Sequence, residues 1–172
     1  MTRTPDTPRA GARDRAFVKS VINCGDLDMR IAVDGTWFHQ GTPIGRKELV
    51  KLFASVLKRE PDGTYWLETP VERGEITVED AAFLALRTDQ VGNDWVFETN
   101  VDDSIRLSPD HPLRVEVDEE TGQPRPYIAV RNGLEARLTR NVYYELVHAA
   151  TEQSDGTWTI ESGGQNWVVG WT

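Results

Sequence analysis

Two passages of this chain carry the same order of residue patterns, and this repetition limits the folds that the chain can adopt. The matched pairs, in order, are Ile31–Val33 with Ile128–Val130, Ile44–Arg46 with Leu138–Arg140, and Asp62–Trp66 with Asp155–Trp158. The offsets between the pairs are 97, 94 and 93 residues, so small deletions align the two passages. The sequence therefore predicts an internal duplication, and convergent use of similar turns and helices is the alternative. Two copies make a pseudo-symmetric pair and not a solenoid.

The first copy predicts two strands followed by a helix. From Asp26 to Val33 the residues alternate between an apolar and a largely polar face, which is typical of a half-buried strand. Asp34-Gly35 then favours a tight reversal into a second extended run, which makes a β-hairpin. From Arg46 to Glu60 apolar residues fall at helical spacing, and Pro61 follows to end the helix. The apolar positions 49, 52, 53 and 56 recur at 143, 146, 147 and 150, so the second copy predicts a helix of the same phase.

Short extended runs separated by turns fill most of the remaining chain. The predicted strands lie within residues 62–70, 75–80, 82–89, 95–100, 104–108 and 113–118. Residues 119–126 predict a polar loop, because they contain two prolines and a glycine. The predicted fold class is α+β, with internally duplicated strand-strand-helix-strand units in two β-rich subdomains, residues 17–81 and 82–172. Residues 1–16 hold almost no apolar side chains and are predicted to form a mobile tail.

The composition of the chain argues against several classes of partner. A formal net charge of -9 and a pI near 4.8 do not fit a duplex nucleic-acid footprint, which needs a basic face. No run approaches the roughly 20 apolar residues of a membrane span, and the N-terminus lacks the apolar stretch of a signal peptide. The single cysteine, Cys24, excludes an internal disulfide and fits a reducing compartment. We therefore expect a cytoplasmic protein with neither a nucleic-acid nor a membrane partner.

Both copies place an arginine at the first turn of the predicted helix. Arg46 follows Gly45 and Arg140 follows Thr139, and these preceding residues are the predicted N-caps. A helix N-terminus carries about half a positive charge, so a cation there is disfavoured unless an anion binds. Exposed backbone amides and a guanidinium group together suit phosphate or carboxylate. The alternative is that each arginine pairs with one of the 28 acidic side chains, a surface contact worth about 0 to 1 kcal/mol.

Two further residues of the first hairpin have two interpretations each. Arg30 stands on the polar face of the predicted strand, where it either pairs with Asp28 or adds an anion-binding group. Trp37, like the other aromatic residues on the predicted strands, favours a packed core, with stacking on a planar ligand as the alternative.

No motif marks this chain as an enzyme. The three histidines, at 39, 111 and 148, show no metal spacing, and there is no nucleophile elbow, metalloprotease helix or phosphate loop. Asp26 and Asp28 have a spacing that suits magnesium, but two carboxylates alone do not define a metal site. The sequence predicts no metal site, leaves the cofactor and any reaction unknown, and favours a binding protein over an enzyme.

The run from Met29 to Phe83 resembles the bacterial DUF1285 family, which has no established activity. Residues 131–150 and the sequence DGTW at 155–158 are similar to the other signature of that family. The resemblance implies an α+β fold with a duplicated core and a C-terminal half loosely similar to pleckstrin-homology folds. It also implies a pocket at the interface of the two halves, for a nucleotide-like ligand, and a role in signalling. Carried over by position, the candidate ligand-binding residues are Arg30, Trp37, Arg46, Glu72, Asn132, Arg140 and Tyr144. Arg73 stands where lysine is usual in the family, which keeps the charge.

These observations leave three functional classes. The leading hypothesis is a regulatory or signalling protein that clamps an anionic, nucleotide-type small molecule between its two copies. The second is a protein-interaction module that docks a partner through an edge strand or the basic first helix. The third is a hydrolase acting on a phosphate-containing substrate, for which no nucleophile or metal motif is present.

Overall fold

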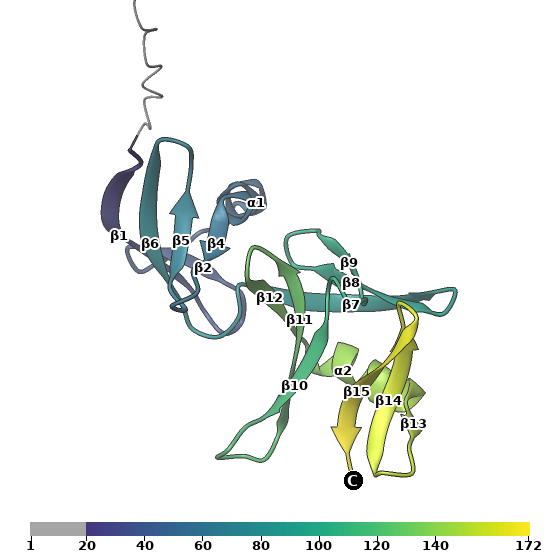
Figure 1. Ribbon diagram of the computed structural model, residues 1–172. Helices are drawn as coiled ribbons and strands as arrows, with labels where there is room; N and C mark the ends of the chain where they lie inside the picture. The colour runs from purple at the N-terminus through teal and green to yellow at the C-terminus, as the bar shows by residue number, and fades with distance from the viewer. Residues whose placement is uncertain (1–19) are drawn as a thin grey trace, which may run out of the picture.

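The computed structural model describes residues 20–172, which form two β-rich parts with one helix each (Figure 1). The predicted tail over residues 1–16 lies outside the described residues. The coarse prediction of a two-part α+β fold is confirmed, with strands predominating over helices.

The N-terminal part is a mixed six-stranded sheet with helix α1 (Lys47–Ser55) beside it. Its strands are β1 (Ile22–Ile31), β2 (Trp37–His39), β3 (Thr42–Pro43), β4 (Leu57–Arg59), β5 (Tyr65–Glu68) and β6 (Glu72–Val78). They lie in the order β3-β2-β1-β6-β5-β4. Strands β1 and β6 run parallel, and Ile22 is paired with Glu72, 50 positions later.

Strand β1 is irregular along its first half. Register shifts interrupt its pairing with β6, and Gly25 and Asp28 have φ angles of 71° and 52°. The amides of these two residues donate to Asn23 Oδ1 and Asp26 Oδ1, at 2.9 and 2.8 Å. Strand β2 pairs only with the last three residues of β1. The first half of β1 is therefore a sheet edge whose bulges and side chains obstruct pairing with another strand.

The predicted reversal at Asp34-Gly35 is confirmed. Gly35 has a φ angle of 84°, and the Ala32 amide donates to the Thr36 carbonyl at 2.9 Å. Strand β1 ends before the reversal, so Val33, expected on the buried face of the strand, is 52% exposed in the turn. Val33 is thereby available to line a surface cleft.

Helix α1 is shorter than the sequence pattern predicts. The prediction of a helix from Arg46 to Glu60 is wrong at both ends, because Arg46 is the N-cap and the helix ends at Ser55. The next residues, Leu57–Arg59, form β4 and pair antiparallel with β5. Leu57 is only 1% exposed in this strand. Burial of its side chain in the sheet therefore outweighs the helical spacing.

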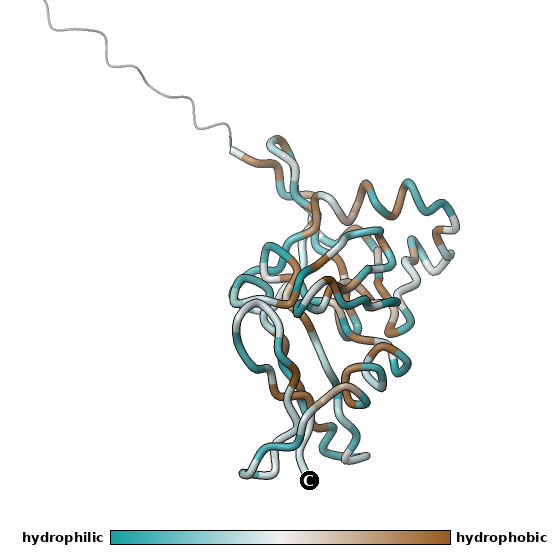
Figure 2. The backbone as a smooth tube through the Cα atoms, turned by 90° about the vertical axis from the view of Figure 1, so that its right-hand side faces the viewer, coloured by the Kyte–Doolittle hydropathy of each residue, from teal (hydrophilic) through white to brown (hydrophobic). Residues whose placement is uncertain are grey.

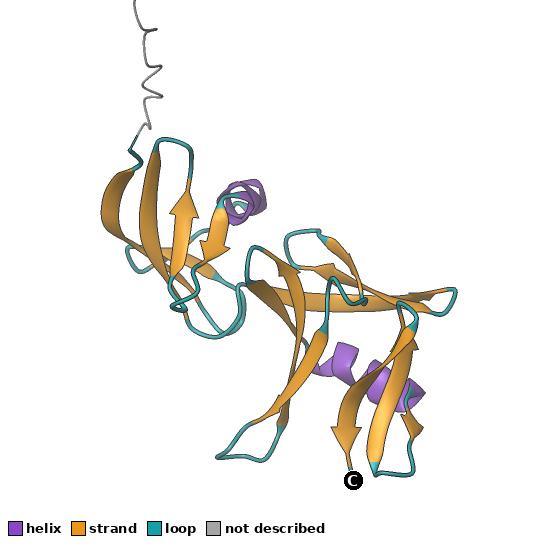
Figure 3. Ribbon diagram, viewed as in Figure 1, coloured by secondary structure: helices purple, strands orange, loops and turns teal. Residues whose placement is uncertain are grey.

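The C-terminal part contains a second six-stranded mixed sheet, a three-stranded sheet and helix α2 (Arg140–Ala149). The larger sheet is formed by β7 (Phe83–Val91), β8 (Asp94–Thr99), β9 (Ser104–Arg106), β10 (Leu113–Val117), β11 (Pro124–Arg131) and β12 (Leu134–Leu138), in the order β10-β11-β12-β7-β8-β9. The smaller sheet is formed by β13 (Thr151–Glu152), β14 (Thr157–Ser162) and β15 (Gln165–Trp171). The larger sheet is curved like half of a barrel, and α2 lies between it and the smaller sheet (Figure 3).

The predicted loop over residues 119–126 is wrong at its C-terminal end. Strand β11 begins at Pro124, and both Pro124 and Pro126 pair with β10. Strand β12 first meets β11 at Tyr127. The two prolines thus lie where β11 is paired on one side only, a position at which the missing amide proton is tolerated.

One hydrophobic core spans both parts of the chain. Its members include Ile31 and Trp37 from the N-terminal part and Phe83, Phe97 and Leu146 from the C-terminal part. Apolar and polar positions alternate along many of the strands (Figure 2), as expected for sheets with one face in a core. Apolar packing therefore joins the two parts.

The two repeated passages share an order of elements but differ in strand pairing. Each passage has an antiparallel hairpin, a helix and then three antiparallel strands. These are β1-β2, α1 and β4-β5-β6 in the first passage, which also has the short strand β3 before its helix, and β11-β12, α2 and β13-β14-β15 in the second. In the first passage β6 pairs with β1 and completes one sheet, whereas in the second β12 pairs with β7 and the last three strands form a separate sheet. The duplication stays a prediction, because a shared order fits both copying and convergence.

Candidate functional site

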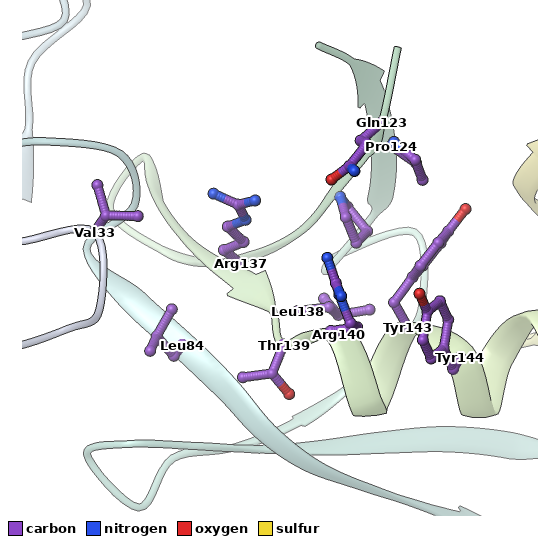
Figure 4. Close-up of a pocket in the computed structure, with 11 residues that line it drawn as sticks. Val33, Leu84, Gln123, Pro124, Arg137, Leu138, Thr139, Arg140, Tyr143 and Tyr144 are labelled. Carbon is purple, nitrogen blue, oxygen red and sulfur yellow. The ribbon is translucent and has the colours of Figure 1, made fainter. Parts of the chain in front are cut away.

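A cleft of about 470 Å³ lies where the two parts meet (Figure 4). It is lined by Val33, Leu84, Gln123, Pro124, Pro126, Arg137, Leu138, Thr139, Arg140, Tyr143 and Tyr144. Val33 comes from the β1–β2 turn and Gln123 from the β10–β11 loop, and the other lining residues come from β7, β11, β12 and the start of α2. A volume of this size lies within the range of small-molecule sites.

The N-terminus of α2 forms one side of this cleft. Thr139 is the N-cap, with extended backbone angles, and its amide donates to the Ala85 carbonyl at 3.1 Å, which anchors the helix start to β7. The helix begins with the Tyr143 amide donating to the Thr139 carbonyl at 2.9 Å. No side chain caps the first amides, and the first turn holds no acidic residue. The positive end of the helix dipole therefore lies at the cleft without a counter-charge in the first turn of α2.

Arg140 adds a full positive charge at the same place. It is the first residue of α2 and its side chain is exposed (Figure 4). Among residues 20–172, no carboxylate forms an ion pair with its guanidinium group, in contrast to Arg137 nearby. A cation beside a helix N-terminus is electrostatically disfavoured. An anion in the cleft would relieve both the unpaired guanidinium and the free amides.

Two adjacent tyrosines of α2 have different environments. Tyr143 is buried and its hydroxyl donates to the Val169 carbonyl at 2.7 Å, so it fixes the helix to β15. Burial, with a smaller effect of the neighbouring tyrosine, raises the pKa of Tyr143. Tyr144 is 57% exposed, and its ring centroid lies 6.4 Å from that of Tyr143. Tyr144 is therefore the aromatic ring of the cleft that a planar ligand can reach.

Arg137 is the second arginine of the cleft and is already paired. Its guanidinium group donates to Asp80 Oδ2 at 2.8 Å, and the Tyr127 hydroxyl donates to Asp80 Oδ1 at 2.6 Å. The side chain of Asp80 is 14% exposed. Burial, together with the hydrogen bond to Asp80, raises the pKa of Tyr127 to about 12. Asp80 thus holds two residues of the C-terminal part through one carboxylate.

Of the predicted site residues, the cleft brings together Arg140 and Tyr144. Arg30 lies on β1, where it pairs with Glu79 at 2.6 Å and lies over the Phe38 ring at 4.2 Å. The expected intrastrand partner, Asp28, is thus replaced by Glu79. The carboxylate of Glu79 accounts for the charge of Arg30 within the N-terminal part.

Trp37 lies in the core of the N-terminal part. Its side chain is 1% exposed and stacks with Phe53 at a centroid distance of 6.1 Å. Its indole Nε1 is buried and has no hydrogen-bond partner among the described residues. This ring is therefore not available to a ligand in the cleft.

The remaining predicted residues lie at three other places. Arg46 is the exposed N-cap of α1 and does not line the cleft. Glu72 lines a separate, mainly apolar groove of about 370 Å³ beside α1, next to Cys24. Asn132 has a φ angle of 51° in the β11–β12 turn, and its carbonyl accepts the Arg59 amide at 3.1 Å. The two helix starts do not line one cleft, and of the two predicted arginines only Arg140 is found there.

Several lining residues were missed by the sequence analysis. Arg137 is on the partly exposed face of β12. The alternation of apolar and polar residues over 134–138 could have predicted this strand and the outward position of Arg137. Pro124 and Pro126 were assigned to a loop, and Val33 was assigned to a buried strand face. These residues come together because strands that are distant in the sequence pair with one another, and local sequence patterns do not predict such pairing.

Among residues 20–172 no cluster of three His, Cys, Asp or Glu side chains is arranged to hold a metal ion. No helix within that range has the length and apolar character needed to cross a membrane.

Fold and cleft together define a two-part, strand-rich protein with a small-molecule-sized cleft at the junction. The chain belongs to the DUF1285 family. Residues 21–81 match its N-terminal domain, described as a domain of unknown function, and residues 82–169 match its C-terminal domain, described as a protein of unknown function.

Two crystal structures of DUF1285 proteins are similar to this chain. The protein from Silicibacter pomeroyi DSS-3 is 39% identical, with a TM-score of 0.83 over 94% of this chain and 91% of that one. The protein from Shewanella baltica OS155 is 26% identical, with a TM-score of 0.57 over 70% of this chain and 90% of that one. No curated protein matches the chain.

Proposed function

We propose that this protein binds a small anionic molecule in the cleft at the start of α2 and serves a regulatory or signalling role in the cytoplasm. The observation that carries the proposal is Arg140, an exposed arginine at an uncapped helix N-terminus that has no acidic partner among the described residues. The alternative interpretation of Arg140 was a surface ion pair with an acidic side chain, and the chain contains 28 of these. An arginine without a counter-ion beside free helix amides favours an anionic guest.

The lining of the cleft favours a ligand that has a planar ring as well as a negative group. Tyr144 offers an exposed ring next to Arg140, and Leu84 and Pro126 add apolar surface. Aromatic stacking combined with a guanidinium and helix amides suits a nucleotide-type molecule. The volume of about 470 Å³ is large enough for such a ligand.

This proposal changes the geometry expected from the repeats. The second copy supplies the charged end of the site, whereas the first supplies only Val33, from its turn. The proposal still includes an ancestral duplication of the two passages and a likeness of the C-terminal half to pleckstrin-homology folds. Neither is needed for anion binding in the cleft.

The test compares two arginine variants that make the same change at a helix start. The wild type, Arg140→Ala and Arg46→Ala are titrated calorimetrically with AMP, ADP, GDP and inorganic pyrophosphate. A hydrogen bond to a charged group is worth about 1.5 to 3 kcal/mol, so Arg140→Ala should raise Kd about tenfold or more. Arg46→Ala, outside the cleft, should leave Kd nearly unchanged.

Equal affinity of wild type and Arg140→Ala, or equal losses in both variants, would reject the site. Tighter binding of a nucleotide than of pyrophosphate would support stacking on Tyr144.

A protein-interaction role is the second candidate, and one observation favours it. The apolar groove beside α1 includes Leu52, which is 60% exposed, and Ile22 and Val71 nearby are 65% and 47% exposed. The basic face of α1 is not free for an acidic partner, because Lys47 and Lys51 both pair with Asp102. The Leu52→Glu variant should no longer bind a protein partner that the wild type binds. The Leu86→Glu variant, changed at another exposed apolar position, should still bind it.

A further inference from the structure

The segment that connects the two parts of the chain contacts both walls of the cleft. Strand β6 ends at Val78 and β7 begins at Phe83, so residues 79–82 form the connector. Its first two residues are Glu79 and Asp80, and the side chain of each reaches a different wall.

Glu79 holds the wall that comes from the N-terminal part. Its Oε2 accepts the Val33 amide at 2.9 Å, and its Oε1 accepts from the Arg30 guanidinium at 2.6 Å. The Glu79 amide also donates to the Ile31 carbonyl at 3.0 Å. The position of Val33 in the cleft therefore depends on the connector.

Asp80 holds the opposite wall. Its carboxylate accepts from Arg137 at 2.8 Å and from the Tyr127 hydroxyl at 2.6 Å. Arg137 lines the cleft, and Asp80 does not. The ion pair is partly shielded from water, with 29% of the arginine side chain and 14% of the aspartate side chain exposed. Asp80 therefore neutralises one of the two guanidinium groups that an anion in the cleft would meet.

We propose that Asp80 is an internal competitor for Arg137, so that a ligand carrying two or more negative charges draws Arg137 from the connector when it binds. The proposal rests on the anion-binding function proposed above and adds its regulation. In the unliganded protein Asp80 occupies Arg137 and lowers the affinity of the cleft. In the liganded protein Arg137 turns to the anion, and the connector loses its contact with β12.

When Arg137 moves from Asp80 to the ligand, the contact between the connector and β12 is lost, so ligand binding affects the junction of the two parts. Because binding free energies are reciprocal, a partner that binds only when the Asp80–Arg137 pair is open and the ligand must raise each other's affinity by the same factor. A partner that holds the connector away from β12 would thus raise ligand affinity. The ligand would in turn favour that partner.

The test uses inorganic pyrophosphate as the probe and the full-length chain. Calorimetric Kd values are compared for the wild type, Asp80→Asn and Asp102→Asn. Asp80→Asn keeps an acceptor for Tyr127 but removes the competing charge, and it should lower Kd about fivefold or more. Asp102→Asn is the matched control, since it makes the same change in charge and breaks the ion pair with Lys47, which measures 2.6 Å. Its exposed charge is screened, so Kd should change by less than about twofold.

A double variant assigns the gain in affinity to Arg137. Asp80→Asn/Arg137→Ala should lose the gain, because the freed guanidinium is the cause of it. Unchanged Kd in Asp80→Asn, with binding to the wild type intact, overturns this inference and leaves the proposed function standing. Absence of pyrophosphate binding to both the wild type and Asp80→Asn overturns the proposed function and this inference with it.

Hydrogen exchange on the wild type keeps the inference testable if Asp80→Asn does not fold. Pyrophosphate should slow amide exchange at residues 139–143, in the first turn of α2, and speed it at Glu79 in the connector. Slower or unchanged exchange at Glu79, together with protection of the helix start, would show that the connector stays attached and would overturn the inference.

Discussion

The phenol of Tyr127 lies between an arginine and a carboxylate. Its ring is 4% exposed, the Arg114 guanidinium lies over it at 4.4 Å, and its hydroxyl donates to Asp80. A phenolate at this position would face the Asp80 carboxylate in a poorly hydrated site. The folded chain therefore favours the neutral phenol, and burial raises its pKa to about 12 from the ordinary value of 10.0.

This pKa predicts a loss of stability at high pH. The folded state keeps a proton that the unfolded state releases near pH 10, so the stabilisation is complete below pH 10 and is lost as the pH rises towards 12. A tyrosinate absorbance titration should show a late component whose amplitude falls by one tyrosine in Tyr127→Phe and is unchanged in Tyr144→Phe. If the late amplitude is the same in Tyr127→Phe as in the wild type, the environment assigned to Tyr127 is wrong.

The β11–β12 hairpin joins the two parts of the chain through its turn. Gly133 has a φ angle of 74°, and a β-carbon built there would lie 3.2 Å from the Arg59 carbonyl oxygen. The neighbouring Asn132 carbonyl accepts the Arg59 amide. The turn therefore needs glycine both for its backbone angle and for its approach to β4.

Gly133→Ala should destabilise the fold more than a glycine replacement in a free turn. Gly92, in the β7–β8 turn, has a φ angle of 66° but no atom within 4 Å of a built β-carbon, so Gly92→Ala measures the backbone strain alone. We expect Gly92→Ala to cost about 1 to 2 kcal/mol and Gly133→Ala to cost more. Urea unfolding of the three proteins gives the comparison. Equal losses would mean that the contact with Arg59 contributes nothing.

Elements formed by neighbouring residues were predicted better than elements formed by distant ones. The Asp34-Gly35 reversal and the start of α2 after Thr139 follow from local residue chemistry. The end of α1 and the strand β4 do not, because Leu57 leaves the helical pattern to pair with Leu67 of β5 and to be buried in a core that distant strands complete. The same limit applies to the site. Arg140 carried a local signal, whereas the partnership of Arg137 with Asp80 depends on two segments 57 positions apart.

At the scale of the whole molecule, the Arg131 side chain links the end of α1 to the C-terminal part. It donates to the Ala54 carbonyl at the end of α1 at 3.1 Å, forms an ion pair with Asp103, and lies over the Phe83 ring at 5.1 Å. The hydrophobic core continues across the same junction. The two parts should therefore unfold together.

Calorimetry should show one unfolding transition for the wild type and a lower Tm for Arg131→Met. The substitution leaves the Asp103 carboxylate and the Ala54 carbonyl without their partner, at a cost of about 2 kcal/mol, which corresponds to a Tm shift of about 4 to 8 °C for a chain of this length. Arg87→Met is the control, because its ion pair with Glu98 is exposed and worth about 0 to 1 kcal/mol. Two separate transitions in the wild type would show that the junction does not couple the parts.

The parallel pairing of β1 with β6 sets an order of events during translation. The ribosome releases β1 first, but its partner emerges about 50 positions later, a wait of roughly 3 to 10 s at ordinary rates of synthesis. During that interval the first half of the nascent strand has both edges open to other chains, since β2 pairs only with its last three residues. The bulges at Gly25 and Asp28, with amides already bonded to side chains two residues earlier, make it a poor template for aggregation while it waits.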